Sequence, residues 1–277
     1  KSSIHGKEFV FIRMNLEDIV ALPKLFKQGC FDLVCNLAAQ AGVRNSIENP
    51  QAYINSNIQG FLNILECCRH NKVSRLVYAS SSSVYGNSDS VPFKETDNVD
   101  HPISLYAATK KSNELMAHTY SHLYGIQTIG LRFFTVYGPW GRPDMALFLF
   151  ADAILNDKPI KVFNNGNLSR DFTYIDDIIS GISVTLLEDS KENNIYQLYN
   201  IGNNSPIQLL DFISEIEKAT GKEAIKQMLS MQAGDVYQTY ADSNQLVENY
   251  KYQPNTHIRK GVENFVGWYK AFYKKPK

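Results

Sequence analysis

The feature that most constrains the fold of this chain is an alternation between short apolar runs and segments with helical periodicity. Short apolar runs bounded by turn residues indicate buried strands, and apolar residues three and four positions apart indicate amphipathic helices. Strands that alternate with helices form a parallel sheet with helices on both faces, so we predict a doubly wound α/β fold. The predicted strands lie at 9–16, 31–39, 74–81, 127–134 and 160–164. One predicted helix follows the first strand and ends near residue 27, and the other predicted helices cover 50–70, 104–125, 144–156 and 174–189.

The last part of the chain has a different pattern. Beyond about residue 200, short mixed elements are separated by turn sequences such as GNNSP and YQPN, before a final predicted helix at 259–273. This change predicts a smaller, mixed C-terminal lobe beside the sheet. We expect the larger domain to comprise 1–136 and about 171–200, and the smaller lobe to comprise about 137–170 and 201–277.

The composition indicates a globular protein whose partner is a small molecule. The 277 residues are 44% hydrophobic, which is enough for a full-sized core. Lys plus Arg equals Asp plus Glu, 28 against 28, so the charge predicts no binding to nucleic acid or to an anionic membrane. No apolar stretch approaches the roughly 20 residues of a membrane span. The four cysteines have neither metal-site spacing nor the density of a disulfide scaffold, which indicates reduced thiols and a cytoplasmic location.

A tyrosine and a lysine one helical turn apart form a candidate catalytic pair. Ser104 can cap a helix without Pro or Gly in which Tyr106 and Lys110 share one face. The preceding predicted strand ends in a run of four serines, Ser80 to Ser83, and ligands bind at the carboxyl ends of parallel strands. A hydroxyl, a phenol and an ammonium are therefore expected to meet there. Taken alone, the pair also fits two surface residues beside a serine that only caps a strand end.

These features together resemble the extended short-chain dehydrogenase/reductase family, and within it the nucleotide-sugar 4-epimerases. The resemblance rests on Ser81, on the YAATK segment 25 positions later (106 minus 81) and on RDFTYIDDI, and it extends through YNIGNNSPIQLLDFI and QAGDVYQTYADSNQL. It implies a Rossmann-type domain that binds NAD and a smaller lobe that binds a UDP-sugar. It also implies a homodimer formed through the helices at 50–70 and 104–125.

The resemblance implies a role for each catalytic residue. Tyr106 removes the proton of the sugar 4-hydroxyl while the hydride at carbon 4 passes to NAD⁺, and the 4-keto sugar turns over and takes the hydride back on its other face. Ser81 binds the same oxygen. Lys110 is expected to lower the pKa of Tyr106 toward neutrality, because a nearby positive charge favours the tyrosinate.

Two further serines limit the reaction. Relatives that eliminate water carry an Asp-Glu pair directly after the active-site hydroxyl, and relatives that decarboxylate keep a Glu two residues after it. This chain has Ser82 and Ser83 there, and a serine cannot do the acid/base work of a carboxylate. The resemblance therefore implies simple 4-epimerisation, with Ser82 as a substrate contact.

The segment RFFTVYGPWGRPDMALF bears on the identity of the sugar. By resemblance, Thr135 lies beside the sugar and Arg142 faces its carbon 6. A guanidinium holds a carboxylate through two parallel hydrogen bonds, which favours a hexuronate over a neutral hexose. The GPWGRPDMA loop resembles the UDP-glucuronate 4-epimerase group. In the alternative interpretation, Arg142 pairs with Asp144 or lies in solvent.

Other residues are expected to bind the UDP part of the sugar nucleotide and the NAD. Arg170 resembles the family's diphosphate-binding arginine, with a salt bridge to Asp176 or Asp177 as the alternative, and Phe163 borders the uracil or is a core strand residue. We predict no metal site, because His118 and His122 lack a third ligand. The resemblance assigns NAD binding to Asn15 and Leu16 at the adenine, to Ala38 and Ala39 at the ribose and nicotinamide, and to Tyr106 and Lys110.

The start of the family pattern is not found in this sequence. Relatives begin with a strand, a Gly-rich phosphate turn and a helix. The resemblance implies that the first strand, this helix and the second strand, on the order of 40 residues, are missing from this sequence. Without them we expect an exposed central strand and little affinity for NAD. Two interpretations stay open: part of a longer active enzyme, or an inactive protein that binds nucleotide sugars and dimerises. The substrate also stays open between UDP-glucuronate and a neutral or N-acetylated UDP-hexose.

Overall fold

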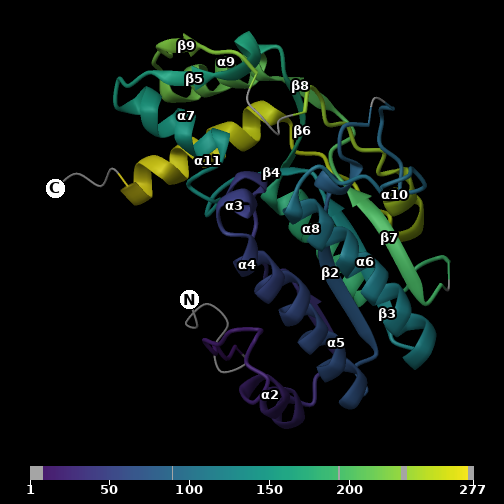
Figure 1. Cartoon of the computed structure of the whole chain (residues 1–277). Coiled ribbons are helices and arrows are strands. Elements are labelled where there is room, and N and C mark those ends of the chain that lie inside the picture. Colours follow the sequence, from purple (N-terminus) through teal and green to yellow (C-terminus); the bar gives the residue numbers. More distant parts are fainter. Residues whose placement is uncertain (1–8, 89, 193, 232–235, 274–277) are drawn as a thin grey trace.

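Four parallel strands form the central sheet of the computed structural model, in the order β1-β2-β3-β7 (Figure 1). Side chains of each strand alternate between two cores: Leu76 and Tyr78 of β2 lie in one, and Val77 lies in the other. The strands are β1 (Leu33–Asn36), β2 (Arg75–Ser81), β3 (Gln127–Phe133) and β7 (Tyr196–Ile201). The structure describes residues 9–88, 90–192, 194–231 and 236–273.

Helices cover both faces of this sheet, as the alternation predicts. Leu65 of α5 and Ala117 of α6 belong to the core on one face, and Ile182 of α8 and Leu246 of α10 belong to the core on the other. The predicted doubly wound, Rossmann-type class is confirmed. The helices of this part are α2 (Ala21–Gly29), α3 (Val43–Glu48), α4 (Pro50–Tyr53), the π-helical turn η2 (Ile54–Gln59), α5 (Gly60–His70), the 3-10 turn η3 (Ser82–Tyr85), α6 (Leu105–Tyr124), α8 (Ile175–Leu187) and α10 (Asn244–Tyr250).

The smaller lobe has a core of its own, rich in aromatic residues such as Phe150, Phe172 and Phe212. We propose that the two lobes correspond to the two domains expected from the sequence, although α10 packs on the sheet of the larger one. The elements of the smaller lobe are β4 (Thr135–Tyr137), β6 (Ser169–Tyr174) and β8 (Pro206–Gln208) in one sheet, β5 (Ile160–Val162) and β9 (Lys226–Met228) in another, the 3-10 turn η4 (Phe163–Gly166), and the helices α7 (Ala146–Leu155), α9 (Leu209–Thr220) and α11 (Ile258–Tyr273).

The strand predicted at 9–16 is not formed. The side chains of Val10 and Phe11 are exposed, and no residue of this stretch pairs with a strand in the described part of the chain. By the family resemblance, 9–16 corresponds to the third strand of the doubly wound order 3-2-1-4, in which the third strand pairs only with the second. An apolar run without a neighbouring strand has no partner for its backbone hydrogen bonds, which is why the prediction from apolar residues is wrong here.

No helix in the described part of the chain is long and apolar enough to cross a membrane.

The helix predicted at 50–70 is continuous but contains a π-helical turn, η2, between α4 and α5. Such turns are often found at functional sites, because the wider turn changes the direction of the side chains it carries. η2 carries Asn57, whose contacts are described below.

Candidate active site

The carboxyl end of β2 and the first turn of α6 bring Ser81 and Tyr106 together. Ser81 is the last residue of β2, and its Oγ accepts hydrogen bonds from the amide (3.2 Å) and the Oγ (2.9 Å) of Ser83. Ser104 caps α6 by accepting a hydrogen bond from the amide of Ala107 (3.1 Å), as predicted. The hydroxyl of Ser81 lowers the pKa of the Tyr106 phenol. The two groups therefore lie close together at this end of the sheet.

Lys110 lies one turn after Tyr106 and is only 4% exposed. Its Nζ donates to the carbonyl of Ala79 (2.8 Å), and this is its one hydrogen bond among the described residues. Burial lowers the pKa of Lys110 to about 8. An ammonium carries three donors. The donors left over at this end of the sheet fit the ribose hydroxyls of a dinucleotide, so the residues present are compatible with the predicted NAD.

Burial and three neighbouring side chains act on the pKa of Tyr106. Burial has the largest effect and raises the pKa of this phenol above its usual value. The hydroxyl of Ser81 and the positive charge of Arg142 lower the pKa, and Tyr53 raises it. The ammonium of Lys110 binds the carbonyl of Ala79, and Arg142 is a second cation that favours the tyrosinate. That Lys110 lowers the pKa of Tyr106 stays a prediction.

The loop after β1 is held by two buried side chains of the helical segment 50–70. Asn57 accepts a hydrogen bond from the amide of Gln40 (2.8 Å) and donates to its carbonyl (3.0 Å). Tyr53 donates to the carbonyl of Gly42 (2.7 Å), and its ring meets the ring of Tyr106 edge-on at 6.1 Å between centroids. Sequence reasoning missed both residues, because polar positions within a helix give no periodic signal.

The other predicted cofactor residues differ in exposure. Ala38 is exposed and Ala39 is half-buried in the loop after β1, where small side chains leave the backbone open to a ligand. Asn15 is exposed. Leu16 packs against the first residue of α5, Gly60. A Cβ added at Gly60 would lie only 2.9 Å from the Cβ of Leu16. Adenine binding by Asn15 and Leu16 stays a prediction.

The loop between β4 and α7 places Arg142 near the catalytic tyrosine. The guanidinium donates through Nε to Oδ1 of Asp144 (3.0 Å) and through Nη2 to Oδ2 (2.5 Å). The ion pair considered as the alternative is therefore present. The same positive charge acts on Tyr106 and Tyr53, so Arg142 is also at the site. Its side chain is 46% exposed, which leaves the guanidinium accessible to a ligand.

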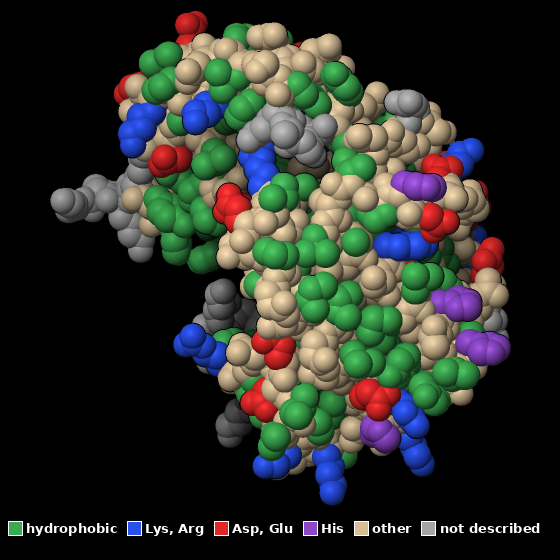
Figure 2. Space-filling view, in the orientation of Figure 1, with side chains coloured by type: hydrophobic (Ala, Val, Ile, Leu, Met, Phe, Trp, Pro, Cys, Tyr) green, Lys and Arg blue, Asp and Glu red, His purple; other side chains and the backbone are tan. Residues whose placement is uncertain are grey.

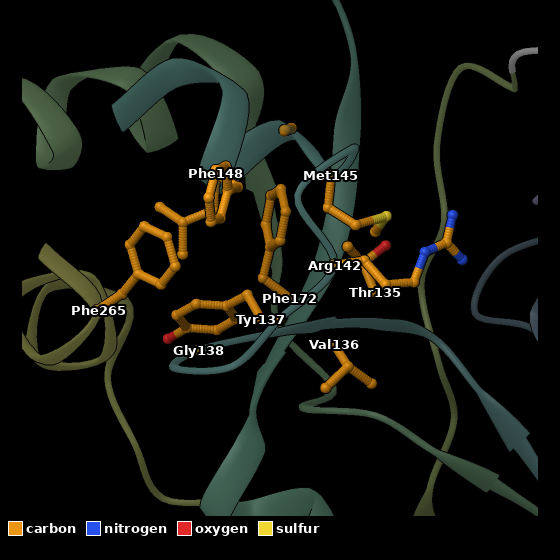
Figure 3. A pocket seen from close by; sticks show the side chains of 12 residues that line it. Thr135, Val136, Tyr137, Gly138, Arg142, Met145, Phe148, Phe172 and Phe265 are labelled. Atoms are coloured by element: carbon orange, nitrogen blue, oxygen red, sulfur yellow. The ribbon is translucent and has the colours of Figure 1, made fainter. Parts of the chain in front are cut away.

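Thr135 and Arg142 lie at the polar end of a small pocket of about 40 Å³. Figure 3 shows the Arg142 side chain extending away from the aromatic side chains of Phe148 and Phe265, which line the other end. Ligand pockets usually enclose roughly 300 Å³ or more. The pocket is therefore too small for a nucleotide sugar, and its polar end is the part that bears on substrate binding.

Phe163 and Arg170 lie in the smaller lobe. Phe163 is half-buried and begins η4 directly after β5, and the Arg44 guanidinium lies over its ring at 5.9 Å. Arg170 is half-buried in β6 and donates from Nη1 to the carbonyls of Ser169 (2.9 Å) and Tyr237 (3.3 Å). The roles of Phe163 at the uracil and of Arg170 at the diphosphate stay predictions.

Ser82 is half-buried at the start of η3, directly after Ser81, and its substrate contact also stays a prediction. His118 packs edge-on against the ring of Tyr196, with 5.0 Å between centroids. Within the ranges that the structure describes, no group of three or more His, Cys, Asp and Glu side chains is placed to hold a metal ion.

A buried ion pair connects the elements that carry the catalytic residues. Glu114 of α6 accepts two hydrogen bonds from the guanidinium of Arg132 on β3, both of 2.9 Å, and one from Ser80 of β2 (2.6 Å). Both charged side chains are 2% exposed. Ser81 and Tyr106 therefore lie on elements that are joined by a buried polar network. This network was not predicted, because its members are far apart in the sequence.

Known proteins resemble this chain over nearly its whole length. The family model described as NAD dependent epimerase/dehydratase family matches residues 2–202. Protein CapI of Staphylococcus aureus is 54% identical over 287 residues, which cover 99% of this chain and 86% of CapI. UDP-glucuronate 4-epimerase 2 of Arabidopsis thaliana is 46% identical over 274 residues, which cover 94% of this chain and 63% of that protein.

A solved structure of a UDP-glucuronic acid 4-epimerase also resembles this chain. The UDP-glucuronic acid 4-epimerase from Bacillus cereus, crystallised with UDP-glucuronic acid and NAD, aligns with a TM-score of 0.90 and 37% identity over 98% of this chain and 85% of that one. The family resemblance seen in the serine run and the YAATK segment is confirmed. The chain belongs to the NAD-dependent epimerase/dehydratase family.

Proposed function

We propose that this protein is an NAD-dependent epimerase that inverts carbon 4 of UDP-glucuronate and so interconverts it with UDP-galacturonate. The position of Arg142 carries this assignment, because an accessible guanidinium lies close enough to Tyr106 to affect its pKa. A guanidinium binds a carboxylate in a bidentate manner, and a hexuronate carries a carboxylate at carbon 6 where a hexose does not. The relatives named as UDP-glucuronate 4-epimerases support the same substrate.

The side chains of this protein move one proton and hold one oxygen. Tyr106 takes the proton of the sugar 4-hydroxyl and later returns it, and Ser81, whose hydroxyl acts on the pKa of Tyr106, holds the same oxygen. Lys110 supplies donors to the ribose. NAD⁺, when bound, supplies the acceptor and then the donor of the hydride at carbon 4. The proton and the hydride that leave the sugar both return to it, so the reaction consumes no further reactant.

A second candidate substrate is a neutral or N-acetylated UDP-hexose. The bidentate pair between Arg142 and Asp144 favours it, because a guanidinium that already binds a carboxylate has a partner without the substrate. In this case carbon 6 would carry a hydroxyl, and Arg142 would stabilise only the conformation of its own loop. Turnover of the two kinds of sugar separates the candidates.

We also propose a cytoplasmic homodimer formed through the helical segment 50–70 (α4, η2 and α5) and α6. Hydrophobic side chains lie on the outer face over these helices (Figure 2), and Ile54, Leu115 and Leu123 expose 40%, 57% and 59% of their surface. A helix with apolar residues on its outer face as well as its core face can pack against a second copy. Sedimentation velocity at the full native length is expected to give twice the mass of one chain.

Proton NMR after incubation with NAD⁺ and UDP-glucuronate tests the proposed reaction. The protein at its full native length is expected to form UDP-galacturonate, without loss of water or carbon dioxide. Conversion of UDP-glucose but not of UDP-glucuronate would favour the second candidate. Binding of UDP-sugars without conversion of any would contradict both and favour the inactive binding protein.

A further inference from the structure

The loop that carries Arg142 contains a strained residue. Trp140 lies two residues before Arg142 and has a φ of 64°, in the left-handed region that bulky side chains rarely adopt. Residues in such conformations persist only where surrounding contacts hold them, and they are concentrated at functional sites. The contacts that hold Trp140 therefore bear on what the loop does.

Trp140 is joined to the last helix, α11, by ring contacts. Its ring centroid lies 5.3 Å from that of Trp268 and 4.9 Å from that of Phe272. These two rings stack on each other with their planes 17° apart. Aromatic contacts at such distances stabilise beyond the area that they bury. Burial alone does not hold Trp140, because 63% of its surface is exposed.

The ion pair of Arg142 cannot by itself direct the guanidinium toward the catalytic tyrosine. Asp144 belongs to the same loop, so the pair fixes the guanidinium relative to the loop and not relative to the rest of the site. The turn hydrogen bond from the amide of Gly141 to the carbonyl of Gly138 (3.2 Å) is also internal to the loop. The ring contacts of Trp140 connect the loop to a different element.

The direction of Arg142 matters because one edge of its guanidinium is open. Asp144 takes Nε and Nη2, and Nη1 makes no hydrogen bond among the described residues. Nη2 would lie 3.4 Å from a Cβ added at Gly42, and the charge acts on Tyr53 and Tyr106. The side chain extends away from the aromatic pocket (Figure 3), so a small rotation of the loop would change the distance between the guanidinium and the catalytic tyrosine.

We propose that Trp140 is a positioning residue, whose contacts with Trp268 and Phe272 fix the loop so that the Nη1 edge of Arg142 meets the carboxylate at carbon 6 of the sugar. This role rests on the proposed uronate substrate. It gives the last helix of the smaller lobe a part in substrate selectivity.

Calorimetric titration with UDP-glucuronate and with UDP-glucose tests this role. The full-length, NAD-loaded protein is used in a Tyr106→Phe background, so that no sugar turns over. Trp140→Gly removes the ring but suits a left-handed φ, so its effect does not come from new backbone strain. The dissociation constant for UDP-glucuronate is expected to rise about tenfold, and that for UDP-glucose less than about twofold. Trp140→Phe keeps an aromatic ring and is expected to restore most of the affinity.

Trp268→Ala provides a second variant on the other side of the contact, and it is expected to show the same selective loss. Equal losses for both sugars, or no change for either, would overturn the proposal, because a purely structural role does not depend on carbon 6. If the wild-type protein converts no UDP-glucuronate but the selective loss of binding is found, the proposed reaction fails and the positioning role stands.

Discussion

The two ends of the candidate site contain the same chemical contact, a carboxylate on a guanidinium, in opposite surroundings. At the catalytic end, Glu114 and Arg132 connect β3 to α6, and both side chains are 2% exposed. At the substrate end, Arg142 and Asp144 lie in one loop, and their side chains are 46% and 63% exposed. The first pair joins regular elements, and the second pair joins only positions within the loop.

This difference separates chemistry from selectivity. Removing one partner of a buried pair leaves an uncompensated charge in the interior, whereas an exposed pair contributes little to stability and can exchange its partner for a ligand. The proton-transfer groups therefore lie on elements that a buried polar network joins. The group proposed to recognise carbon 6 lies on a loop, where substrate contacts can vary without changing the fold.

The largest effect is expected from Tyr106→Phe. Turnover should fall by roughly a thousandfold because the general base is lost, and UDP-sugar affinity should change less than about threefold. Steady-state kinetics and calorimetry measure the two quantities. Tyr120→Phe is the matched control, since Tyr120 lies on the same helix and binds Glu66. Unchanged turnover in Tyr106→Phe would remove this residue from the mechanism.

A paired substitution tests the comparison itself. Glu114→Gln should lower the free energy of unfolding by about 3 kcal/mol, because Arg132 is left buried without its counter-charge. Asp144→Asn makes the same chemical change in the exposed pair and should cost less than about 1 kcal/mol. Urea denaturation measures both. Equal losses would show that the two ends are not built differently.

Arg142→Leu should affect the substrate end alone. The kcat/KM for UDP-glucuronate is expected to fall by roughly 10- to 100-fold, because a charged bidentate contact is lost, while a neutral UDP-hexose is affected much less. The variant also loses a charge that lowers the pKa of Tyr106, so the activity that remains should shift to higher pH. Arg259→Leu, at a surface ion pair with Glu215, is the control. Equal loss on both sugars would contradict the carboxylate role.

The smallest effect concerns the cost of burying Lys110. Burial lowers the pKa of this lysine to about 8 from its ordinary value of 10.5. The unfolded chain keeps the proton up to higher pH than the folded chain, so the stability of the fold should rise between pH 8 and 10.5. Lys110→Met should be more stable than wild type by about 1 to 3 kcal/mol at pH 7, although inactive. Thermal unfolding against pH measures this, and a variant less stable at pH 7 would contradict it.

The sequence predicted the geometry of the catalytic end more fully than that of the substrate end. Ser81 and Tyr106 lie on a strand and a helix, and the periodicity of these elements is enough to place both at the carboxyl edge of the sheet. A loop has no such periodicity, so the pairing of Arg142 with Asp144 was one of two alternatives until the structure showed it. The left-handed conformation of Trp140 has no sequence signal, because a non-glycine residue is rarely found there.

Other misses have the same origin in tertiary contacts. The apolar stretch 9–16 has the composition of a strand, but a strand also needs a neighbour, and composition does not identify the neighbour. The effect of Arg142 on the pKa of Tyr106 was not predicted, because Arg142 comes from a loop 36 positions later (142 minus 106). Asn57 and Glu114 form hydrogen bonds with residues of other elements, and the sequence around each of them does not indicate these partners.

UDP-glucuronate that carries deuterium at carbon 4 tests the proposed hydride transfer directly. The UDP-galacturonate formed by the full-length protein with NAD⁺ is expected to retain the deuterium at carbon 4, because the hydride leaves that carbon and returns to it within one site. Proton NMR in ordinary water would then show no signal for hydrogen at carbon 4 of the product. Loss of the label to solvent, or inversion at another carbon, would contradict the proposed mechanism.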